Sequence, residues 1–227
     1  MSVLARIQTG ALFTVAKFLK LRVPETIAGA GSRAKVGAWC AEHGYANALV
    51  VTDASVIRLK IADKLFASLR KADVAYAIYD RVLPSPTVGM ATQAAALGKS
   101  TGAQVVVAIG GGSVIDCAKL AAAAMTSSRK PKSPVGTLMV WRDPLPIVAI
   151  PTTAGTGSEV SVGAVISDDV THKKSIMIAP RIVPVLAVLD GETMQGLPPQ
   201  WTAGTVFDAL THACEAYISR HYDAGAE

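Results

Sequence analysis

The sequence predicts an α/β fold built around a parallel β-sheet. Short apolar runs rich in β-branched residues alternate along the chain with longer segments whose apolar residues have helical spacing. A turn of three glycines joins one of these runs to the helical segment behind it. Regular alternation of strands and helices is typical of a parallel sheet with helices packed on its faces.

The expected elements follow this alternation in order. Helices are expected over residues 32–43, 55–71, 87–102, 113–128 and 201–219. Strands are expected over residues 48–53, 74–79, 105–109, 147–150 and 185–190, and the continuous apolar run at 105–109 is expected to be buried. Two further runs, at 160–167 and 174–178, flank a polar turn and are expected to form a β-hairpin. Because ligands of parallel α/β folds bind at the carboxyl ends of the strands, we expect the functional site there.

Composition indicates a globular, non-exported protein. Hydrophobic residues make up 51% of the 227 residues and the mean hydropathy is +0.38, which is enough to fill a sizeable core. The first 22 residues carry no continuous apolar region of a signal peptide, and no run reaches the ~18 apolar residues of a membrane span. Three widely separated cysteines fit neither a disulfide framework nor a zinc knuckle. We therefore expect a cytoplasmic location and no membrane partner.

The charge pattern disfavours nucleic acid as a partner. The formal net charge is +5, but the basic residues are dispersed apart from Arg129–Lys132 and the pair Lys173 and Lys174. A nucleic-acid surface normally combines a dense basic stripe with aromatic side chains, and aromatics are only 5% of this chain. The basic excess instead favours small anionic ligands.

The glycine turn has the chemistry of a phosphate-binding site. Gly110, Gly111 and Gly112 let the backbone approach a phosphate closely and adopt a positive φ where the turn needs one. The helix behind the turn presents unpaired N–H groups and the positive end of its dipole. Ser113 is placed to cap this helix and to donate a hydrogen bond. The alternative is a plain turn between a strand and its helix, since the spacing matches neither the G-x-G-x-x-G nor the Walker fingerprint.

An aspartate ends each of two expected strands. Asp53, at the end of the first strand, is placed either to accept hydrogen bonds from an adenosine ribose or to cap the following helix, and both roles can coexist. The ribose role would favour NAD over NADP because a carboxylate repels the 2′-phosphate. Asp190, at the end of the last strand, is expected to form a turn before Gly191.

The last helical segment carries a carboxylate and an imidazole four residues apart. Asp208 and His212 therefore project from the same face of the helix, one turn apart. Such a pair can bind one metal ion, and it is also a common surface ion pair. The spacing alone leaves both interpretations open.

Three sequence blocks follow one another in a fixed order. The first is GGGSxxDxAK, from Gly110 to Lys119, and the second is PTTAGTGSE, from Pro151 to Glu159. The third is FDALTHAxEAY, from Phe207 to Tyr217. Together these blocks resemble the iron-containing (group III) alcohol dehydrogenases, and the third is similar to the first metal-binding helix of that family. The resemblance extends from Pro24 to Tyr217.

The resemblance implies a metal-dependent alcohol dehydrogenase that transfers a hydride between an alcohol and NAD, and reduces an aldehyde or ketone in reverse. The implied fold is a dehydroquinate synthase-like dinucleotide-binding α/β domain over residues 1–197, followed by the start of an all-helical metal-binding domain over 198–227. Fe²⁺, or alternatively Zn²⁺, would lie between the two domains. The implied partners are a small alcohol or aldehyde and, in the complete protein, further copies of itself.

The resemblance also implies roles for individual residues. Asp53 would hold the adenosine ribose, and Gly110, Gly111, Gly112 and Ser113 would hold the pyrophosphate. The nicotinamide half would contact Thr152, Thr153, Ser161 and Lys174, the last of these at the ribose. Asp116 is a shared motif residue that belongs to the implied cofactor-binding set, with no specific contact assigned to it. Asp208 and His212 would be metal ligands, and no side-chain base is assigned.

The chain departs from the family's pattern at the metal site. Family members complete this site with two more histidines downstream, whereas His221 lies too near the metal helix, and His43 and His172 precede it. We therefore expect the chain to be an N-terminal fragment that turns over little or no alcohol by itself. Two alternatives stay open: an NAD-binding module without turnover, or a relative such as a maleylacetate reductase or a glycerol dehydrogenase.

Overall fold

The computed structural model of the chain describes residues 22–127, 140 and 142–219. The segment before residue 22 and residues 220–227 of the expected helical domain lie outside the described residues. Within the described part, every helix is too short or too polar to cross a lipid bilayer.

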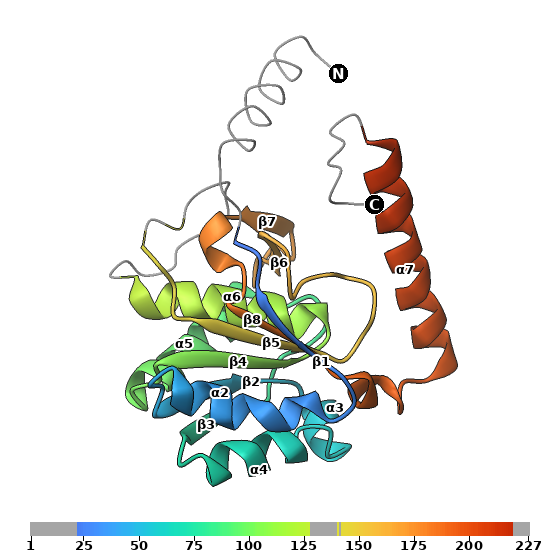
Figure 1. Ribbon diagram of the computed structural model, residues 1–227. Coiled ribbons are helices and arrows are strands. Elements are labelled where there is room, and N and C mark those ends of the chain that lie inside the picture. The colour runs from blue at the N-terminus through green and yellow to red at the C-terminus, as the bar shows by residue number, and fades with distance from the viewer. Residues whose placement is uncertain (1–21, 128–139, 141, 220–227) are drawn as a thin grey trace.

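A six-stranded parallel sheet forms the centre of the structure (Figure 1). Its strands are β1 (Glu25–Ala28), β2 (Asn47–Val51), β3 (Ala75–Tyr79), β4 (Val105–Gly110), β5 (Ile147–Pro151) and β8 (Leu186–Leu189). They stand in the order β1-β8-β5-β4-β2-β3, and each neighbouring pair is parallel. The α/β prediction is confirmed. The central strand β4 is buried along its whole length, as its continuous apolar run predicts.

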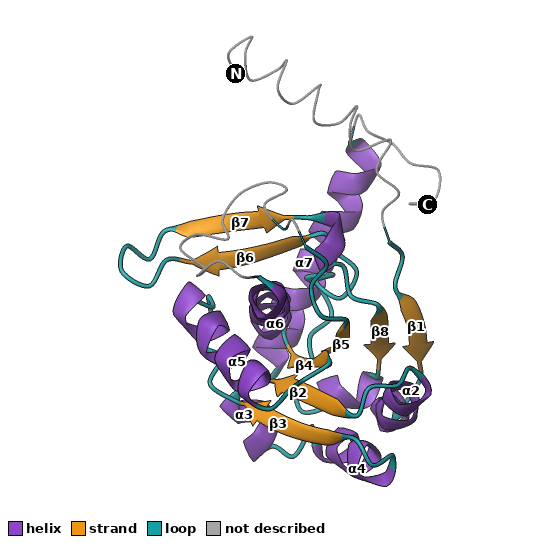
Figure 2. Ribbon diagram, turned by 90° about the vertical axis from the view of Figure 1, so that its left-hand side faces the viewer, coloured by secondary structure: helices purple, strands orange, loops and turns teal. Residues whose placement is uncertain are grey.

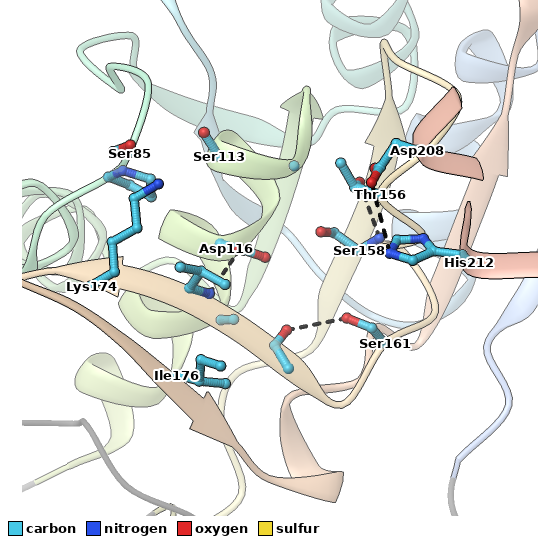
Figure 3. Close-up of a pocket in the computed structure, with 15 residues that line it drawn as sticks. Ser85, Ser113, Asp116, Thr156, Ser158, Ser161, Lys174, Ile176, Asp208 and His212 are labelled. Atoms are coloured by element: carbon cyan, nitrogen blue, oxygen red, sulfur yellow. Dashed lines mark hydrogen bonds and ion pairs between the residues drawn. The ribbon is translucent and has the colours of Figure 1, made fainter. Parts of the chain in front are cut away.

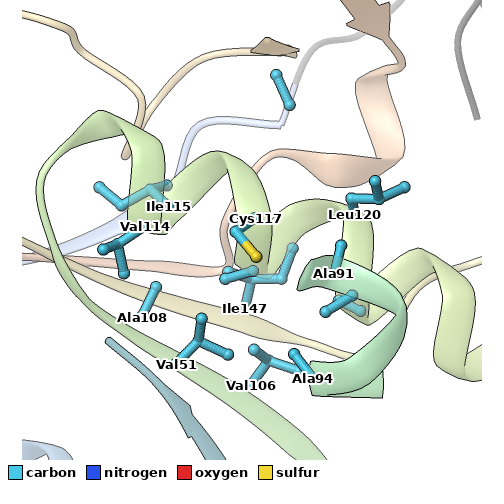
Figure 4. Close-up of a cluster of buried hydrophobic side chains, with 14 of the residues drawn as sticks. Val51, Ala91, Ala94, Val106, Ala108, Val114, Ile115, Cys117, Leu120 and Ile147 are labelled. Atoms are coloured by element: carbon cyan, nitrogen blue, oxygen red, sulfur yellow. The ribbon is translucent and has the colours of Figure 1, made fainter. Parts of the chain in front are cut away.

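Helices cover both faces of the sheet (Figure 2). The helices α2 (Val36–Glu42) and α4 (Asp63–Lys71) pack on one face, and α5 (Val88–Ser100) and α6 (Gly112–Thr126) pack on the other. Figure 4 shows Val114, Ile115 and Cys117 of α6 among the buried side chains of the second face. Burial of α6 on this scale fixes its position on the sheet.

A separate antiparallel hairpin packs against α6. Its strands are β6 (Gly163–Ser167) and β7 (Lys174–Ile178), and the short 3-10 helix η2 (Pro180–Ile182) follows. The expected hairpin is confirmed, although its first strand begins at Gly163 rather than at residue 160. The hairpin therefore forms a third layer beyond the sheet and α6 (Figure 2).

Strand β1 has no clear sequence signal. Its four residues, Glu-Thr-Ile-Ala, form neither an apolar run nor a long alternation, and three of them are exposed. It lies at the edge of the sheet and pairs with β8, from Glu25 opposite Leu186 to Ala28 opposite Leu189. Backbone hydrogen bonds hold such a strand, so side-chain patterns do not predict it.

The helix expected over 55–71 is in fact two helices, α3 (Ala54–Arg58) and α4. Lys60 lies between them with φ of 57°. The N–H groups of Lys60 and Ile61 donate to the carbonyls of Ile57 and Val56, which is the Schellman arrangement that ends a helix. Glycine is the usual residue at the left-handed position of this motif. Because a lysine occupies this position here, the sequence does not indicate that the helix ends.

The strand order has a switch point between β2 and β4. The chain runs from β2 to β3 on one side and then returns to β4 on the other side of β2. In open α/β sheets, ligands bind outside the carboxyl ends of the strands at such a point. Asp53 follows β2 and the glycine turn follows β4, so both predicted features lie at the switch point.

A buried aspartate fastens the carboxyl end of β8 to the segment that follows β1. Asp190 is fully buried and caps the 3-10 helix η3 (Gly191–Met194), so the expected turn before Gly191 is a capped helix. Its carboxylate also accepts from the backbone N–H groups of Gly31 and Arg33 and from the guanidinium of Arg33, in the 3-10 helix η1 (Ser32–Lys35). Burial alone would raise the pKa of Asp190, but the hydrogen bonds from Arg33, Gly31 and Glu192 outweigh it and hold the pKa below its usual range.

Helix α7 (Pro199–Ile218) stands apart from the sheet (Figure 1), and none of its residues is buried. It confirms the helix expected over 201–219. One face carries Asp208 and His212. With about 100° between successive residues, the opposite face carries an apolar set that we call the outer stripe. The outer stripe consists of Val206, Phe207, Leu210, Tyr217 and Ile218, each more than half exposed.

Candidate functional site

A cavity of about 440 Å³ lies where α6, the loop after β5, the β6–β7 hairpin and α7 meet (Figure 3). Its lining includes seven of the predicted site residues: Gly112, Ser113, Asp116, Ser161, Lys174, Asp208 and His212. Ser85, Thr156 and Ser158 add hydroxyl groups, and Val165 and Ile176 of the hairpin add apolar surface. Predicted residues from distant parts of the sequence therefore share one space.

The other predicted residues lie at the carboxyl ends of β2, β4 and β5, outside the cavity lining. Gly110 ends β4 opposite Pro151, and its carbonyl accepts a 3.0 Å hydrogen bond from the N–H of Thr152. The side chain of Thr153 lies 3.6 Å from the position that a Cβ on Gly111 would occupy. Asp53 follows β2, the strand beside β4.

The glycine turn differs from the sequence-based expectation in two respects. Gly111, not Ser113, is the N-cap residue of α6, and its backbone is extended, with φ of -74° and ψ of -177°. None of Gly110, Gly111 and Gly112 has a positive φ. Ser113 lies inside the first turn of the helix, where its side chain faces the cavity (Figure 3).

Space, rather than backbone conformation, requires two of these glycines. A Cβ on Gly110 would lie 2.5 Å from Cγ2 of Val114, where α6 packs on β4. A Cβ on Gly112 would lie 2.9 Å from Cγ2 of Thr156, in the loop after β5. Any larger residue at either position would force a neighbouring side chain to move.

Asp53 caps helix α3, as one of its two predicted roles requires. Its Oδ1 accepts from the N–H groups of Ser55 and Val56, at 2.7 and 3.1 Å. Both bonds fall on Oδ1, so the cap does not use Oδ2. The capping role is confirmed, and the ribose role stays a prediction that this geometry permits.

Lys119, which has no sequence-predicted role, is fully buried in α6. Its Nζ donates to the carbonyl of Ser161 at 2.8 Å, to the hydroxyl of Ser161 at 3.0 Å and to the carbonyl of Gly163 at 2.8 Å. One turn earlier on the same helix, Oδ2 of Asp116 accepts from the N–H of Val165 at 2.9 Å. The signal was a charged pair three residues apart in an otherwise apolar helix, which places both side chains on one face.

Burial shifts the pKa of both members of this pair toward the neutral form. It lowers the pKa of Lys119 to about 8, against the opposing effect of Asp116 and Glu159. It raises the pKa of Asp116, against the opposing effects of the Val165 N–H and the charge of Lys119. The two groups thus partly stabilise each other's charge inside the fold.

Ser161, just before the hairpin, and Lys174, in the hairpin, differ in how available their polar atoms are to a ligand. The hydroxyl of Ser161 accepts from Lys119 and donates to the carbonyl of Gly163 at 3.2 Å. Lys174 begins β7, is exposed and lines the cavity (Figure 3). A ligand in the cavity can therefore reach the ammonium of Lys174 more freely than the hydroxyl of Ser161.

Asp208 and His212 face the cavity from α7 (Figure 3). Oδ1 of Asp208 lies 3.9 Å from Nε2 of His212, and Nδ1 of His212 lies 3.1 Å from the carbonyl of Gly155. A Cβ on Gly155 would lie 2.4 Å from the carbonyl oxygen of Thr205, so a glycine lets α7 approach this loop. These distances suit both an ion pair and a pair of metal ligands. The described residues contain no group of three or more histidine, cysteine or acidic side chains arranged around one metal position.

The parallel sheet, with its candidate site at the switch point, is the architecture of dinucleotide-binding α/β proteins. Residues 24–191 match the family described as iron-containing alcohol dehydrogenase. The chain belongs to the iron-containing alcohol dehydrogenases, and the resemblance found in its sequence blocks is confirmed. Membership of this family implies NAD(H) and a metal ion.

Known relatives support this assignment. Alcohol dehydrogenase 4 of Schizosaccharomyces pombe is 41% identical over 191 residues, which cover 84% of this chain and 45% of that protein. Lactaldehyde reductase of Escherichia coli K12 is 38% identical, over 83% of this chain and 50% of that protein. The crystal structure of a 1,3-propanediol oxidoreductase superposes with a TM-score of 0.86 at 34% identity, over 91% of this chain and 54% of that one. The chain thus spans about half the length of the relatives it matches.

Proposed function

We propose that the complete protein is an NAD-dependent, metal-assisted alcohol dehydrogenase, which oxidises a small alcohol to an aldehyde or ketone and catalyses the reverse reduction. The observation that carries this proposal is the shared cavity. The first turn of α6 and the Asp208–His212 pair of α7 open into the same space, so groups suited to phosphate and to metal meet there. Family membership supports the same activity.

The first turn of α6 would bind the cofactor's pyrophosphate. The first N–H groups of a helix have no partner within the helix, and here those of Gly112 and Ser113 lie at the cavity. Gly110 and Gly111 shape the turn, and Oδ2 of Asp53 would accept from the adenosine ribose. NAD, when bound, supplies the hydride acceptor.

The nicotinamide half would lie between α6 and α7. It would be bordered by four residues of the predicted set: Thr152, Thr153, Ser161 and Lys174. Asp116, which is buried at the cavity wall, would orient the neighbouring backbone through Val165 rather than take part in the reaction. No side-chain base is assigned.

Asp208 and His212 would hold the metal ion, either Fe²⁺ or Zn²⁺. If Nδ1 of His212 donates to the carbonyl of Gly155, the lone pair of Nε2 is left on the side of Asp208. A carboxylate oxygen and an imidazole nitrogen suit both ions. The metal, when bound, supplies Lewis-acid polarisation of the substrate oxygen.

The proposal also covers the domain boundary, the oligomeric state and the cellular location. The domain boundary falls between residues 197 and 198, supported by α7, which begins at Pro199 and buries none of its residues. The complete protein forms a homo-oligomer, as the family resemblance implies. The reaction takes place in the cytoplasm, because the three cysteines are free rather than joined in disulfides. Two of these thiols are buried, and burial raises the pKa of Cys40 to about 11 and that of Cys117 to about 12.

The ribose role of Asp53 predicts a preference for NADH over NADPH. Asp53→Ser should keep a helix cap but remove the charge, so the ratio of the two Kd values should fall by about tenfold. Titration of the 227-residue protein with each cofactor measures this ratio. If the unsubstituted protein binds NADPH as tightly as NADH, Asp53 is a cap and nothing more.

The proposed activity predicts that Asp208 and His212 are needed for turnover but not for cofactor binding. In the complete protein with Fe²⁺ or Zn²⁺, Asp208→Ala and His212→Ala should each lower turnover of primary alcohols and diols by about two orders of magnitude, because Lewis-acid polarisation contributes several kcal/mol. The Kd of NADH should not change. NADH absorbance and a cofactor titration measure the two quantities.

Cys214→Ala, on the same helix but exposed on the side away from Asp208 and His212 and outside the cavity lining, is the matched control and should change neither quantity. Turnover that survives both alanine substitutions would refute the assigned metal site. Turnover that is absent from the complete protein with every alcohol and metal tested would refute the proposed function.

A further inference from the structure

Lys119 is the largest of the fully buried residues, and it does not line the cavity. A buried ammonium is costly unless its donors are satisfied. Here all three donors of Nζ are used, on Ser161 and Gly163. A residue with these partners acts on the cavity through other residues rather than directly.

The three acceptors lie where the chain enters the β6–β7 hairpin. Ser161 and Gly163 flank Val162, whose carbonyl accepts from the N–H of Ala179 at the far end of β7. Asp116 holds the next part of β6 through the N–H of Val165. The start of the hairpin is therefore attached to α6 by side chains of two residues on one helix face.

Helix α6 thereby joins two parts of the cavity. Its first turn, at Gly112 and Ser113, is the proposed pyrophosphate site. Two turns later, Lys119 holds the residues from which the hairpin wall of the cavity starts. The separation between the two is set by a single buried helix.

The position of this wall identifies the part of the cofactor that it faces. The pyrophosphate would sit at α6, and the reacting carbon must reach the substrate near Asp208 and His212. The nicotinamide end must therefore occupy the space between α6 and α7, beside the hairpin, whereas the adenosine end points toward Asp53 and the switch point.

We propose that Lys119 is a positioning residue for the nicotinamide end of the cofactor: by binding Ser161 and Gly163, its buried ammonium sets the distance between the hairpin wall and the phosphate-binding turn. This inference rests on the proposed function. Methionine at this position would fill a similar volume but could not hold two carbonyls and a hydroxyl, so the wall would lose its fixed place.

Binding of NADH and ADP-ribose to the 227-residue protein tests this proposal, because ADP-ribose lacks the nicotinamide. Lys119→Met should weaken NADH binding by about tenfold and reduce the fluorescence gain of bound NADH, since a displaced wall no longer fits the ring. ADP-ribose affinity should stay within about twofold, because its contacts lie on the other side of the turn. Lys119→Arg, which keeps the charge and donors, should restore part of the loss.

Lys99→Met, on the exposed end of α5, is the matched control and should change neither affinity. If Lys119→Met does not fold, as judged by circular dichroism, Lys119→Gln takes its place, because a neutral amide keeps two donors without a buried charge. The same selective loss of NADH binding is expected from it.

The outcomes separate the two proposals. If the unsubstituted protein binds both ligands and the folded Lys119 variants lose both equally, or neither, the positioning role is wrong and cofactor binding stands. If the unsubstituted protein binds neither ligand, cofactor binding by this chain and the positioning role are both wrong.

Discussion

Asp190→Asn is expected to lower the free energy of unfolding by about 3 kcal/mol at neutral pH, the scale of a broken buried ion pair. The substitution preserves the volume of the side chain but removes the charge that faces the Arg33 guanidinium. Arg33 is itself almost fully buried, so its charge would be left without its main partner. The amide would also have only one acceptor oxygen for the N–H groups of Gly31, Arg33 and Glu192.

The effect of Asp190→Asn should depend on pH in one direction. The pKa of Asp190 is lower in the folded protein than its usual 3.8, so the unfolded chain binds the proton more readily as the pH falls. The stabilisation by Asp190 is therefore fully present above that value and is lost as pH falls through the folded pKa. Urea unfolding should show a constant difference between variant and parent near neutral pH and a smaller difference below about pH 4.

Asp143→Asn is the matched control for this prediction. Asp143 pairs with Arg181 through the same chemistry, but both side chains are exposed. A solvated pair adds little to stability, so this substitution should leave the unfolding midpoint nearly unchanged. Equal effects of the two substitutions would show that burial is not what gives the Asp190 pair its strength.

Gly112→Val is expected to raise the Kd of NADH more than about 100-fold, the largest effect on binding that we predict. Its Cβ would lie 2.9 Å from Cγ2 of Thr156 and at the first turn of α6. The two added methyl groups would then occupy the space in which a phosphate meets the helix N–H groups. Calorimetric titration of a variant shown to be folded measures the loss.

Two further variants separate exclusion of the ligand from repacking of the protein. Gly204→Val places the same side chain on α7, where a Cβ meets no atom within 4 Å, and it should not affect NADH binding. Thr156→Ser in the Gly112→Val background removes the crowded methyl group. If that double variant regains full affinity, or if Gly112→Val never lost it, the phosphate site has been misplaced.

The sequence predicted those parts of the fold whose side chains follow a regular apolar pattern. The strands at 105–109 and 147–150 are continuous apolar runs, and they became the buried strands β4 and β5. Strand β1 was missed because an edge strand depends on backbone pairing with β8. The break before α4 was missed because a lysine, rather than a glycine, adopts the left-handed conformation there.

Seven residues of the cavity lining were predicted from the sequence, but how they come together was not. Asp208 and His212 were predicted as metal ligands from their spacing together with the family resemblance, yet their place in the same cavity as Ser113 depends on how closely Gly155 allows α7 to approach. Ser113 was expected to cap α6, but the extended backbone of Gly111 takes that place and leaves the serine inside the first turn. Lys119 was part of a quoted block, and only the folded hairpin shows what its ammonium binds.

Helix α7 lies against the rest of the protein through the backbone of Thr205 and the ring of His212, with no buried side chain of its own. A helix held in this way has a small free-energy difference between its docked and undocked positions. If Asp208 and His212 hold the proposed metal ion together with groups across the cavity, the ion binds only the docked population, and its apparent Kd is the intrinsic Kd divided by the docked fraction. Contacts made to the outer stripe, far from any ligand atom, would thus tighten metal binding by shifting that population.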